Sequence, residues 1–265
     1  MEPSSIVAGI TTQLVSKILG PTVEYIGKEA AQFAEKCNIN LSDIFARSAR
    51  KLGPRLDEPG KVNPRVLKGV LDDGRFSEDA LSREYFAGVL VSARSEVNHD
   101  DRGVPVLAVI RELSALQMRM HYVFYELVRR LYASTTLSLT RRPDAGNLLV
   151  FIPMPVLIDA LLLGEQRGVL THCIGGLHRS GLIGDIYAYG KPEFMAPLFP
   201  NAPAPGVLLE PTAHGAEVYL WAIGVRDPRV AKFFEVTDSE SRLNEVAIPP
   251  GAKRAQMRDG VPQVV

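Results

Sequence analysis

Residues 171–181 read T-H-C-I-G-G-L-H-R-S-G, and the fold of the C-terminal half of the chain depends on the conformation of this segment. As a loop, the segment directs several backbone N–H groups inward, where they hold an oxyanion and lower the pKa of the Cys173 thiol. Arg179 then binds two oxygens of that anion. As a helix, the segment buries Cys173, Ile174 and Leu177 in a core and leaves Arg179 exposed.

The loop conformation is similar to the signature of cysteine-dependent protein tyrosine phosphatases, in which His-Cys is followed after five residues by Arg-Ser. The resemblance implies that Cys173 attacks phosphorus and that Arg179 binds the phosphoryl oxygens. It also implies that Asp144, within P-D-A-G at residues 143–146, protonates the leaving oxygen, and that Ser180 assists breakdown of the thiophosphate.

The surroundings of the segment favour the helix instead. The phosphatase fold needs a central sheet built largely before the loop, whereas the first 130 residues predict almost only helices. The helix that should follow Arg179 is interrupted by Gly181, Gly184 and Gly190. We therefore interpret the phosphatase match as coincidental and keep a cysteine-dependent phosphatase as the alternative hypothesis.

Composition excludes several classes of protein. The chain has 265 residues, and 30 Lys and Arg balance 30 Asp and Glu, so no net charge draws it toward nucleic acid or an anionic membrane. Two cysteines, Cys37 and Cys173, lie far apart in sequence and suit a reducing compartment. No apolar run reaches transmembrane length, and the apolar start lacks the basic region of a signal peptide. These features predict a cytoplasmic protein.

The order of the predicted elements indicates a mainly α protein with a small β component. Asn63-Pro64 and Ser114 with Gln117 are typical helix starts. After residue 133 the order becomes strand, helix, turn, helix, strand, Pro-rich excursion and strand, which is the order of a winged helix. We therefore expect N-terminal helices in 1–60, a helical middle segment in 61–112, a winged-helix-like domain in 113–237 and a mobile tail in 238–265.

Five blocks of this chain, in order, resemble the bacterial abortive-infection alpha proteins. The blocks are N-P-R-V-L-K-G-V-L-D-D-G (63–74), L-S-R-E-Y-F-A-G-V-L-V-S-A-R (81–94), V-L-A-V-I-R-E-L-S-A-L-Q-M-R (106–119), L-H-R-S-G-L-I (177–183) and L-E-P-T-A-H-G-A-E-V (209–218). The resemblance implies a role in defence against phage and supplies no catalytic residues. We therefore predict a non-enzymatic protein that acts by binding a protein partner or a second copy of itself.

Charge argues against the usual ligand of a winged helix. Over residues 165–225, five acidic side chains outnumber three basic ones, and the predicted recognition helix carries one full charge, Arg179. Because duplex binding depends on phosphate neutralisation, a DNA-binding regulator is only the second alternative. One basic stretch is a candidate for meeting an anionic partner. Its residues are Arg119, Arg129, Arg130, Arg141 and Arg142.

Two further kinds of site are disfavoured. The histidines near Cys173 lack the spacing of metal ligands, so we predict no metal and no cofactor. Residues 6–19, from Ile6 to Leu19, carry only Lys17 as a charge. A membrane-surface helix usually shows a basic face, so packing on residues 23–37 or on a second copy is favoured over membrane contact.

Overall fold

The computed structural model describes residues 17, 39–97, 99–164, 166, 168–244 and 246–265. The helices predicted for residues 6–37, with the candidate membrane contact and Cys37, lie outside the described residues. The chain divides into two compact units. Unit 1 comprises Met1–Glu112 and Leu220–Pro228, and unit 2 comprises Leu113–Tyr219 and Arg229–Val265.

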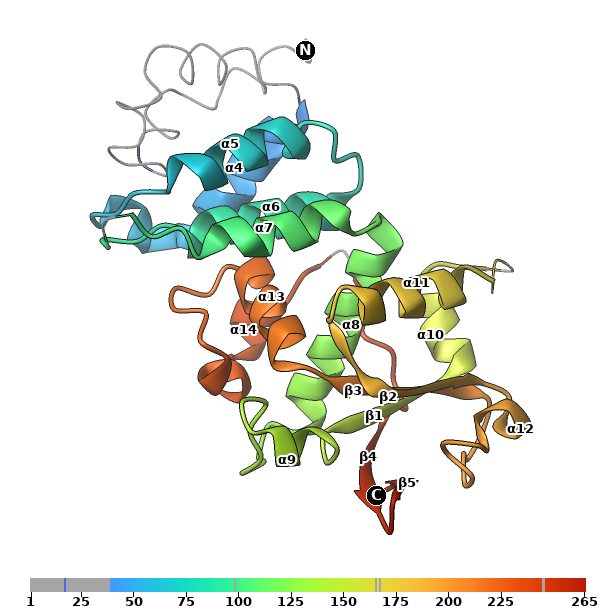
Figure 1. The fold of residues 1–265 in the computed structure, drawn as a ribbon. Coiled ribbons are helices and arrows are strands. Elements are labelled where there is room, and N and C mark those ends of the chain that lie inside the picture. Colours follow the sequence, from blue (N-terminus) through green and yellow to red (C-terminus); the bar gives the residue numbers. More distant parts are fainter. Residues whose placement is uncertain (1–16, 18–38, 98, 165, 167, 245) are drawn as a thin grey trace. The chain divides into compact units, whose positions relative to one another are not determined.

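Unit 1 is helical in its described part (Figure 1). Its elements are α4 (Ile39–Leu52), the 3-10 helix η1 (Gly53–Asp57), α5 (Pro64–Gly74), α6 (Ala80–Ser92), α7 (Gly103–Glu112) and the end of α13 (Ala213–Ile223).

The sequence explains where these helices begin and how closely they pack. Asn63 accepts a hydrogen bond from the backbone N–H of Arg65, and Pro64 occupies the first turn of α5, which confirms the predicted start. Helix α6 is buried along almost its whole length. Gly88 on α6 lets the backbone of Ala222 come so close that an added Cβ would lie 1.7 Å from the carbonyl oxygen of Ala222.

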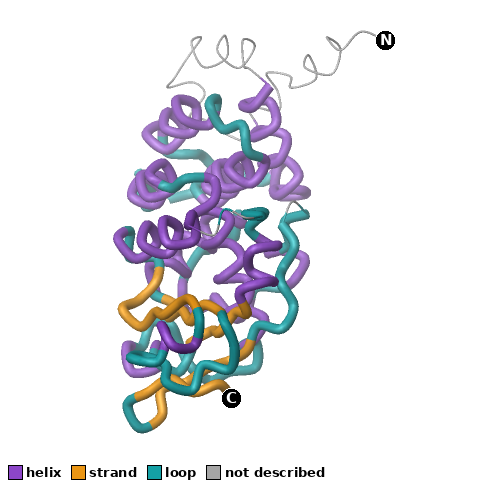
Figure 2. Tube along the Cα trace, turned by 90° about the vertical axis from the view of Figure 1, so that its right-hand side faces the viewer, coloured by secondary structure: helices purple, strands orange, loops and turns teal. Residues whose placement is uncertain are grey.

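Unit 2 combines helices with one antiparallel sheet (Figures 1 and 2). It starts with α8 (Ala115–Leu131), whose predicted capping box between Ser114 and Gln117 is confirmed. The elements that follow are α9 (Arg142–Ala145), β1 (Leu149–Pro153), α10 (Met154–Ala160), α11 (Gly168–Arg179), β2 (Ile183–Gly190), α12 (Pro192–Met195), β3 (Gly206–Pro211), the start of α13, η2 (Val230–Glu235), α14 (Asp238–Ser241), β4 (Lys253–Arg258) and β5 (Val261–Val264).

The sheet has the strand order β2-β3-β1-β4-β5, and every pairing is antiparallel. Helices α8, α10 and α11 lie on one side of it in Figure 1. The segment between β2 and β3 packs Met195 and Phe199 against Leu149, Phe151 and Leu208. Because these five side chains are buried together, the Pro-rich excursion is a structural part of unit 2.

The coarse prediction is confirmed, since the protein is mainly α with a small β component. The structure differs from the expectation of a tail without regular structure in 238–265, because this region forms α14, β4 and β5, and β4 pairs with β1. Low apolar periodicity misled that prediction, since strand pairing uses backbone groups that every residue carries. The predicted boundary at residue 237 also differs, because Leu220–Pro228 belong to unit 1 and Arg229–Val265 to unit 2.

Candidate functional site

The segment of residues 171–181 is helical over most of its length. Cys173 lies inside α11, and the helix continues to Arg179, beyond which the backbone N–H of Ser180 still donates to the carbonyl of Gly176 at 3.0 Å. The N–H groups of a helix interior are bonded to preceding carbonyls, so they do not converge on an anion. The loop that a phosphatase needs is therefore replaced by a helix.

Cys173 is a packing residue of this helix. Its exposed fraction is 0%, as are those of Ile174 and Leu177. Burial raises the pKa of the Cys173 thiol to about 11, which is the opposite of what a nucleophilic cysteine requires. Arg179, by contrast, is exposed. These are the positions that the helical interpretation predicts.

The candidate general acid is also engaged elsewhere. Asp144 is buried in α9, where its carboxylate accepts a hydrogen bond from the backbone N–H of Ser138 at 2.9 Å. Its second contact is the guanidinium of Arg141, 3.7 Å away. Helices α9 and α11 lie well apart in Figure 1. The structure therefore does not bring Cys173, Arg179, Asp144 and Ser180 together, and the phosphatase hypothesis has no assembled site.

The basic stretch does not form one surface patch. Arg129 is 4% exposed, and its guanidinium binds Glu126 at 2.8 Å and also contacts Asp238. Arg130 binds the same Glu126 at 2.6 Å. Arg119 is half-buried on α8, while Arg141 and Arg142 are exposed at α9. Arg129 is engaged within the fold, because a guanidinium buried against carboxylates does not reach a partner, and the binding role of the other four residues stays a prediction.

Glu126 is the centre of a buried polar cluster in unit 2. Its exposed fraction is 0%, and Tyr219 donates a hydrogen bond to its Oε2 at 2.5 Å. Burial raises the pKa of Glu126, but hydrogen bonds from Arg129 and Tyr219 outweigh that effect and hold the pKa below its ordinary value. The cluster joins α8 to α13 and α14. The polar groups of the cluster form hydrogen bonds with one another, so we assign the cluster a structural role.

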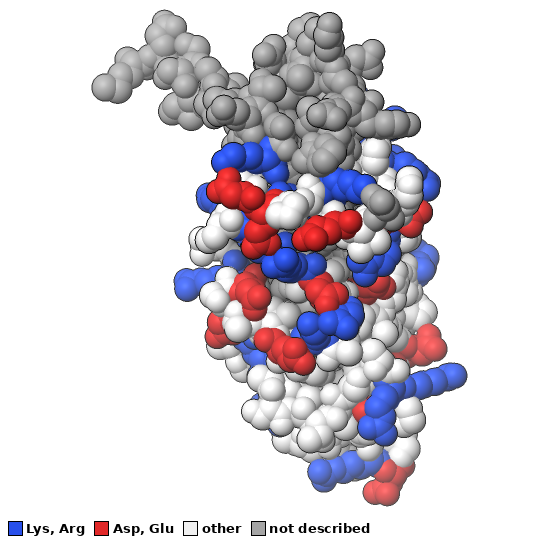
Figure 3. All heavy atoms as spheres, turned by 90° about the vertical axis from the view of Figure 1, so that its left-hand side faces the viewer, with Lys and Arg blue, Asp and Glu red and all other residues white. Residues whose placement is uncertain are grey.

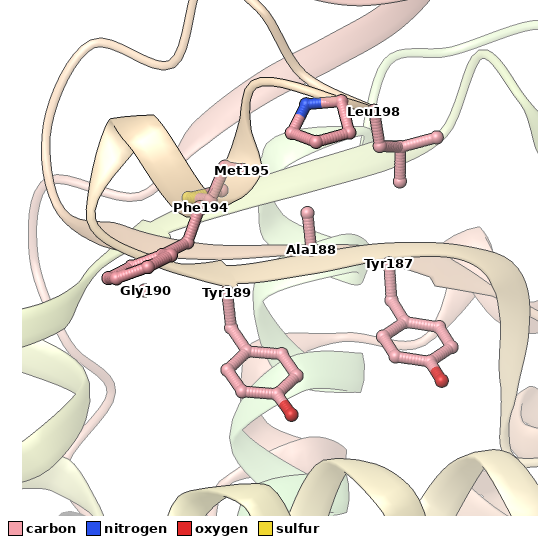
Figure 4. Close-up of a pocket in the computed structure, with 8 residues that line it drawn as sticks. Tyr187, Ala188, Tyr189, Gly190, Phe194, Met195 and Leu198 are labelled. Atoms are coloured by element: carbon pink, nitrogen blue, oxygen red, sulfur yellow. The ribbon is translucent and has the colours of Figure 1, made fainter.

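A groove runs along β2, which is an edge strand of the sheet formed by the described residues (Figure 4). Its volume is about 490 Å³. Figure 4 shows Tyr187 and Tyr189 on one side of β2 and Ala188 on the other. The opposite wall comes from α12 and the turn after it. The lining residues are Tyr187, Ala188, Tyr189, Gly190, Phe194, Met195, Pro197 and Leu198.

The groove exposes one aromatic side chain of α12. Phe194 is 76% exposed, although a phenyl ring on a surface costs free energy in water. Tyr187 and Tyr189 are only half-buried. The ring of Tyr187 lies 4.9 Å from the ring of His178 on α11, and His178 in turn pairs with the exposed Asp185 at 3.0 Å. The groove is open and apolar, with Phe194 in its α12 wall, and such a surface is typical of a site for another molecule.

Sequence analysis missed this groove. It treated residues 182–189 as a strand and the following prolines as an excursion, without placing α12 against that strand. The alternation Tyr-x-Tyr indicated which residues of β2 share a face, but it did not indicate that α12 packs on the side of Ala188 (Figure 4).

Two absences hold for the described part of the chain. No group of three or more His, Cys, Asp or Glu side chains is arranged there to hold a metal ion. Nor does any helix there have the length and apolar character needed to cross a membrane.

Comparison with known proteins adds no relative. No protein family, no curated protein and no solved structure matches this chain.

Proposed function

We propose that this chain is a cytoplasmic, non-enzymatic protein of bacterial abortive infection, and that it binds a protein partner through a winged-helix-type domain in unit 2. An extended segment of the partner lies in the groove along β2. The groove is the observation that carries this proposal, because it is an apolar surface beside β2, which is an edge strand of the sheet that the described residues form.

The connectivity of unit 2 supports a winged-helix-type domain. Helix α8 is followed by β1, the helix pair α10 and α11, and the β2–β3 hairpin. Strand β3 pairs with both β1 and β2, so the three strands have the order expected for a winged helix. In this assignment α11 is the recognition helix, and the segment that holds α12 is the wing.

Charge supports a protein partner over a nucleic acid. The exposed surface of α11 and β2 presents Arg179 together with Asp185, while Glu210 lies half-buried on β3. Figure 3 presents the side of the molecule away from α11, and Lys and Arg are interspersed with Asp and Glu there as well. A phosphate backbone needs a continuous basic surface, and this arrangement supplies none at α11.

The edge of β2 suits an extended segment of the partner. A strand at a sheet edge has unpaired N–H and C=O groups, and a second chain in extended form satisfies them. The rings of Tyr189 and Phe194 then supply apolar contact for alternate side chains of the partner. Aromatic residues in such positions are frequent hot spots of binding energy.

The role in phage defence rests on the ordered resemblance to abortive-infection alpha proteins between residues 63 and 218. A plaque assay tests it together with the groove. A susceptible bacterial host carries either the wild-type chain, Phe194→Asp or Tyr189→Asp, and plaque numbers are compared with those of a host that carries an empty vector. We expect the wild type to lower plaque numbers and both groove variants to lose at least roughly 10-fold of that protection, since an aromatic hot spot contributes about 2 kcal/mol or more.

The chain offers a matched control. Leu162 is 74% exposed in unit 2 and does not line the groove, so Leu162→Asp changes surface apolarity equally and should retain full protection. Full protection by a folded Phe194→Asp variant would remove the groove from the proposal. Loss of protection in a folded Cys173→Ala variant would restore the catalytic hypothesis, and a wild type without protection would remove the defence role.

A further inference from the structure

Three arginines gather around the short helix η1 in unit 1. Arg94, directly beyond the end of α6, donates from Nη1 to the carbonyl of Arg55 at 2.9 Å and from Nη2 to the carbonyl of Leu56 at 3.4 Å. It also contacts the carbonyl of Glu58. Arg226, which follows α13, reaches the carboxylate of Glu58 at 3.2 Å. Three segments far apart in sequence thus place guanidinium groups at one location.

Among the described residues, three guanidiniums at this location interact with the carboxylate of Glu58. That carboxylate pairs with Arg226 and acts through its charge on Arg55 and Arg94. The neighbouring Asp57 pairs instead with Lys17, at 2.5 Å. Burial, followed by the charges of Arg226 and Arg94, lowers the pKa of Arg55. An arginine does not give up its proton in a protein, so the shift indicates that positive charge is destabilised here.

Two donors at this location lack acceptors. The Nε atoms of Arg55 and Arg94 are buried and have no hydrogen-bond partner in the described part of the protein. A buried donor left without an acceptor is destabilising, and folded proteins satisfy nearly all such groups with protein, water or ligand. An anion with several oxygen atoms would both neutralise positive charge here and accept hydrogen bonds from these N–H donors.

We propose that Arg55, Arg94 and Arg226 form an anion site that binds the phosphate group of a small molecule. A phosphate has several acceptor oxygens and two negative charges, and guanidinium groups bind it in a forked geometry. The Nε–H groups of Arg55 and Arg94 supply donors, while Arg226 supplies charge from the solvent side, where its side chain is 62% exposed. This site lies in unit 1 and does not depend on the partner-binding groove in unit 2.

Thermal unfolding of the full chain in inorganic phosphate tests the site. Melting temperatures are measured in phosphate and in sodium chloride at equal ionic strength, and pyrophosphate serves as a second probe. We expect phosphate at 100 times its dissociation constant to raise the melting temperature of the wild type by roughly 5 °C. Arg55→Gln should abolish that rise.

The same variant distinguishes a binding residue from a structural one. Without phosphate, Arg55→Gln removes a like charge, so its melting temperature should equal or exceed that of the wild type. A structural role for Arg55 predicts a lower melting temperature instead. Arg65→Gln is the matched control, because Arg65 is exposed on α5 of the same unit and the charge change is identical.

Three results would overturn the proposal. The first is a wild type that phosphate and chloride stabilise equally. The second is a phosphate effect that survives in Arg55→Gln or disappears in Arg65→Gln. The third is binding of a short single-stranded DNA without binding of phosphate or pyrophosphate, which would assign the arginines to a nucleic-acid backbone.

Discussion

The reactivity of Cys173 is the sharpest test of the fold around α11. The thiolate is the form that reacts with alkylating reagents. With a pKa of about 11, roughly one Cys173 in 4,000 is ionised at pH 7.4, against roughly one in 40 for a cysteine at its ordinary pKa of 9.0. Ionisation alone therefore slows alkylation of the folded protein about 100-fold relative to the unfolded chain.

Access slows the reaction further. Because Cys173 is 0% exposed, a reagent reaches the sulfur only when α11 opens locally. The measured ratio should thus be at least about 100-fold. The assay follows iodoacetamide labelling by mass spectrometry at pH 7.4, in native buffer and in urea. Cys37→Ser provides the background, so that one thiol reports, and the additional change Cys173→Ser gives the blank.

Fast labelling of Cys173 in the native protein would contradict this prediction. A cysteine in an anion-binding loop has a pKa of roughly 3.5 to 7.5 and is largely ionised at pH 7.4. If native Cys173 were labelled as fast as the unfolded chain, or if its rate rose with a midpoint below pH 8, the sulfur would not lie in an apolar core. The helical assignment of residues 171–179 would then be wrong.

Two further predictions concern stability. Gly88→Ala should cost about 2–4 kcal/mol in urea unfolding, because its Cβ would overlap the carbonyl oxygen of Ala222 at 1.7 Å. Gly168→Ala, whose Cβ meets nothing within 4 Å, should change stability by less than about 1 kcal/mol, and equal losses would refute the close approach. Burial lowers the pKa of His121 to about 4, so folding disfavours its protonated form. Stability should therefore fall as the pH drops from the ordinary value of 6.5 toward 4, by up to roughly 3 kcal/mol. Urea unfolding of His121→Gln should lack that part of the pH dependence, and an unchanged profile would contradict it.

Local chemistry made several helices predictable. Asn63-Pro64 and the Ser114–Gln117 box start α5 and α8 because a cap needs only residues within one turn. The helical interpretation of residues 171–180 rested instead on the surroundings of the segment, and it predicted both the burial of Cys173 and the exposure of Arg179.

Tertiary contacts decided the remainder, because they join residues that no local pattern connects. Strand β4 pairs with β1 through backbone hydrogen bonds. Such pairing requires no apolar periodicity in the sequence of the tail. From the sequence, Arg129 was expected on the surface, but in the fold it is buried and pairs with Glu126 and Asp238.

The two candidate sites also depend on tertiary contacts. The groove exists because α12 folds back along β2, and the arginine site exists because Arg55, Arg94 and Arg226 come from three separate segments. The sequence alone determined several helices, among them α5, α8 and α11, and which side of α11 is apolar. The folded chain determined which side chains meet, since long-range contacts depend on the packing of whole elements rather than on neighbours in sequence.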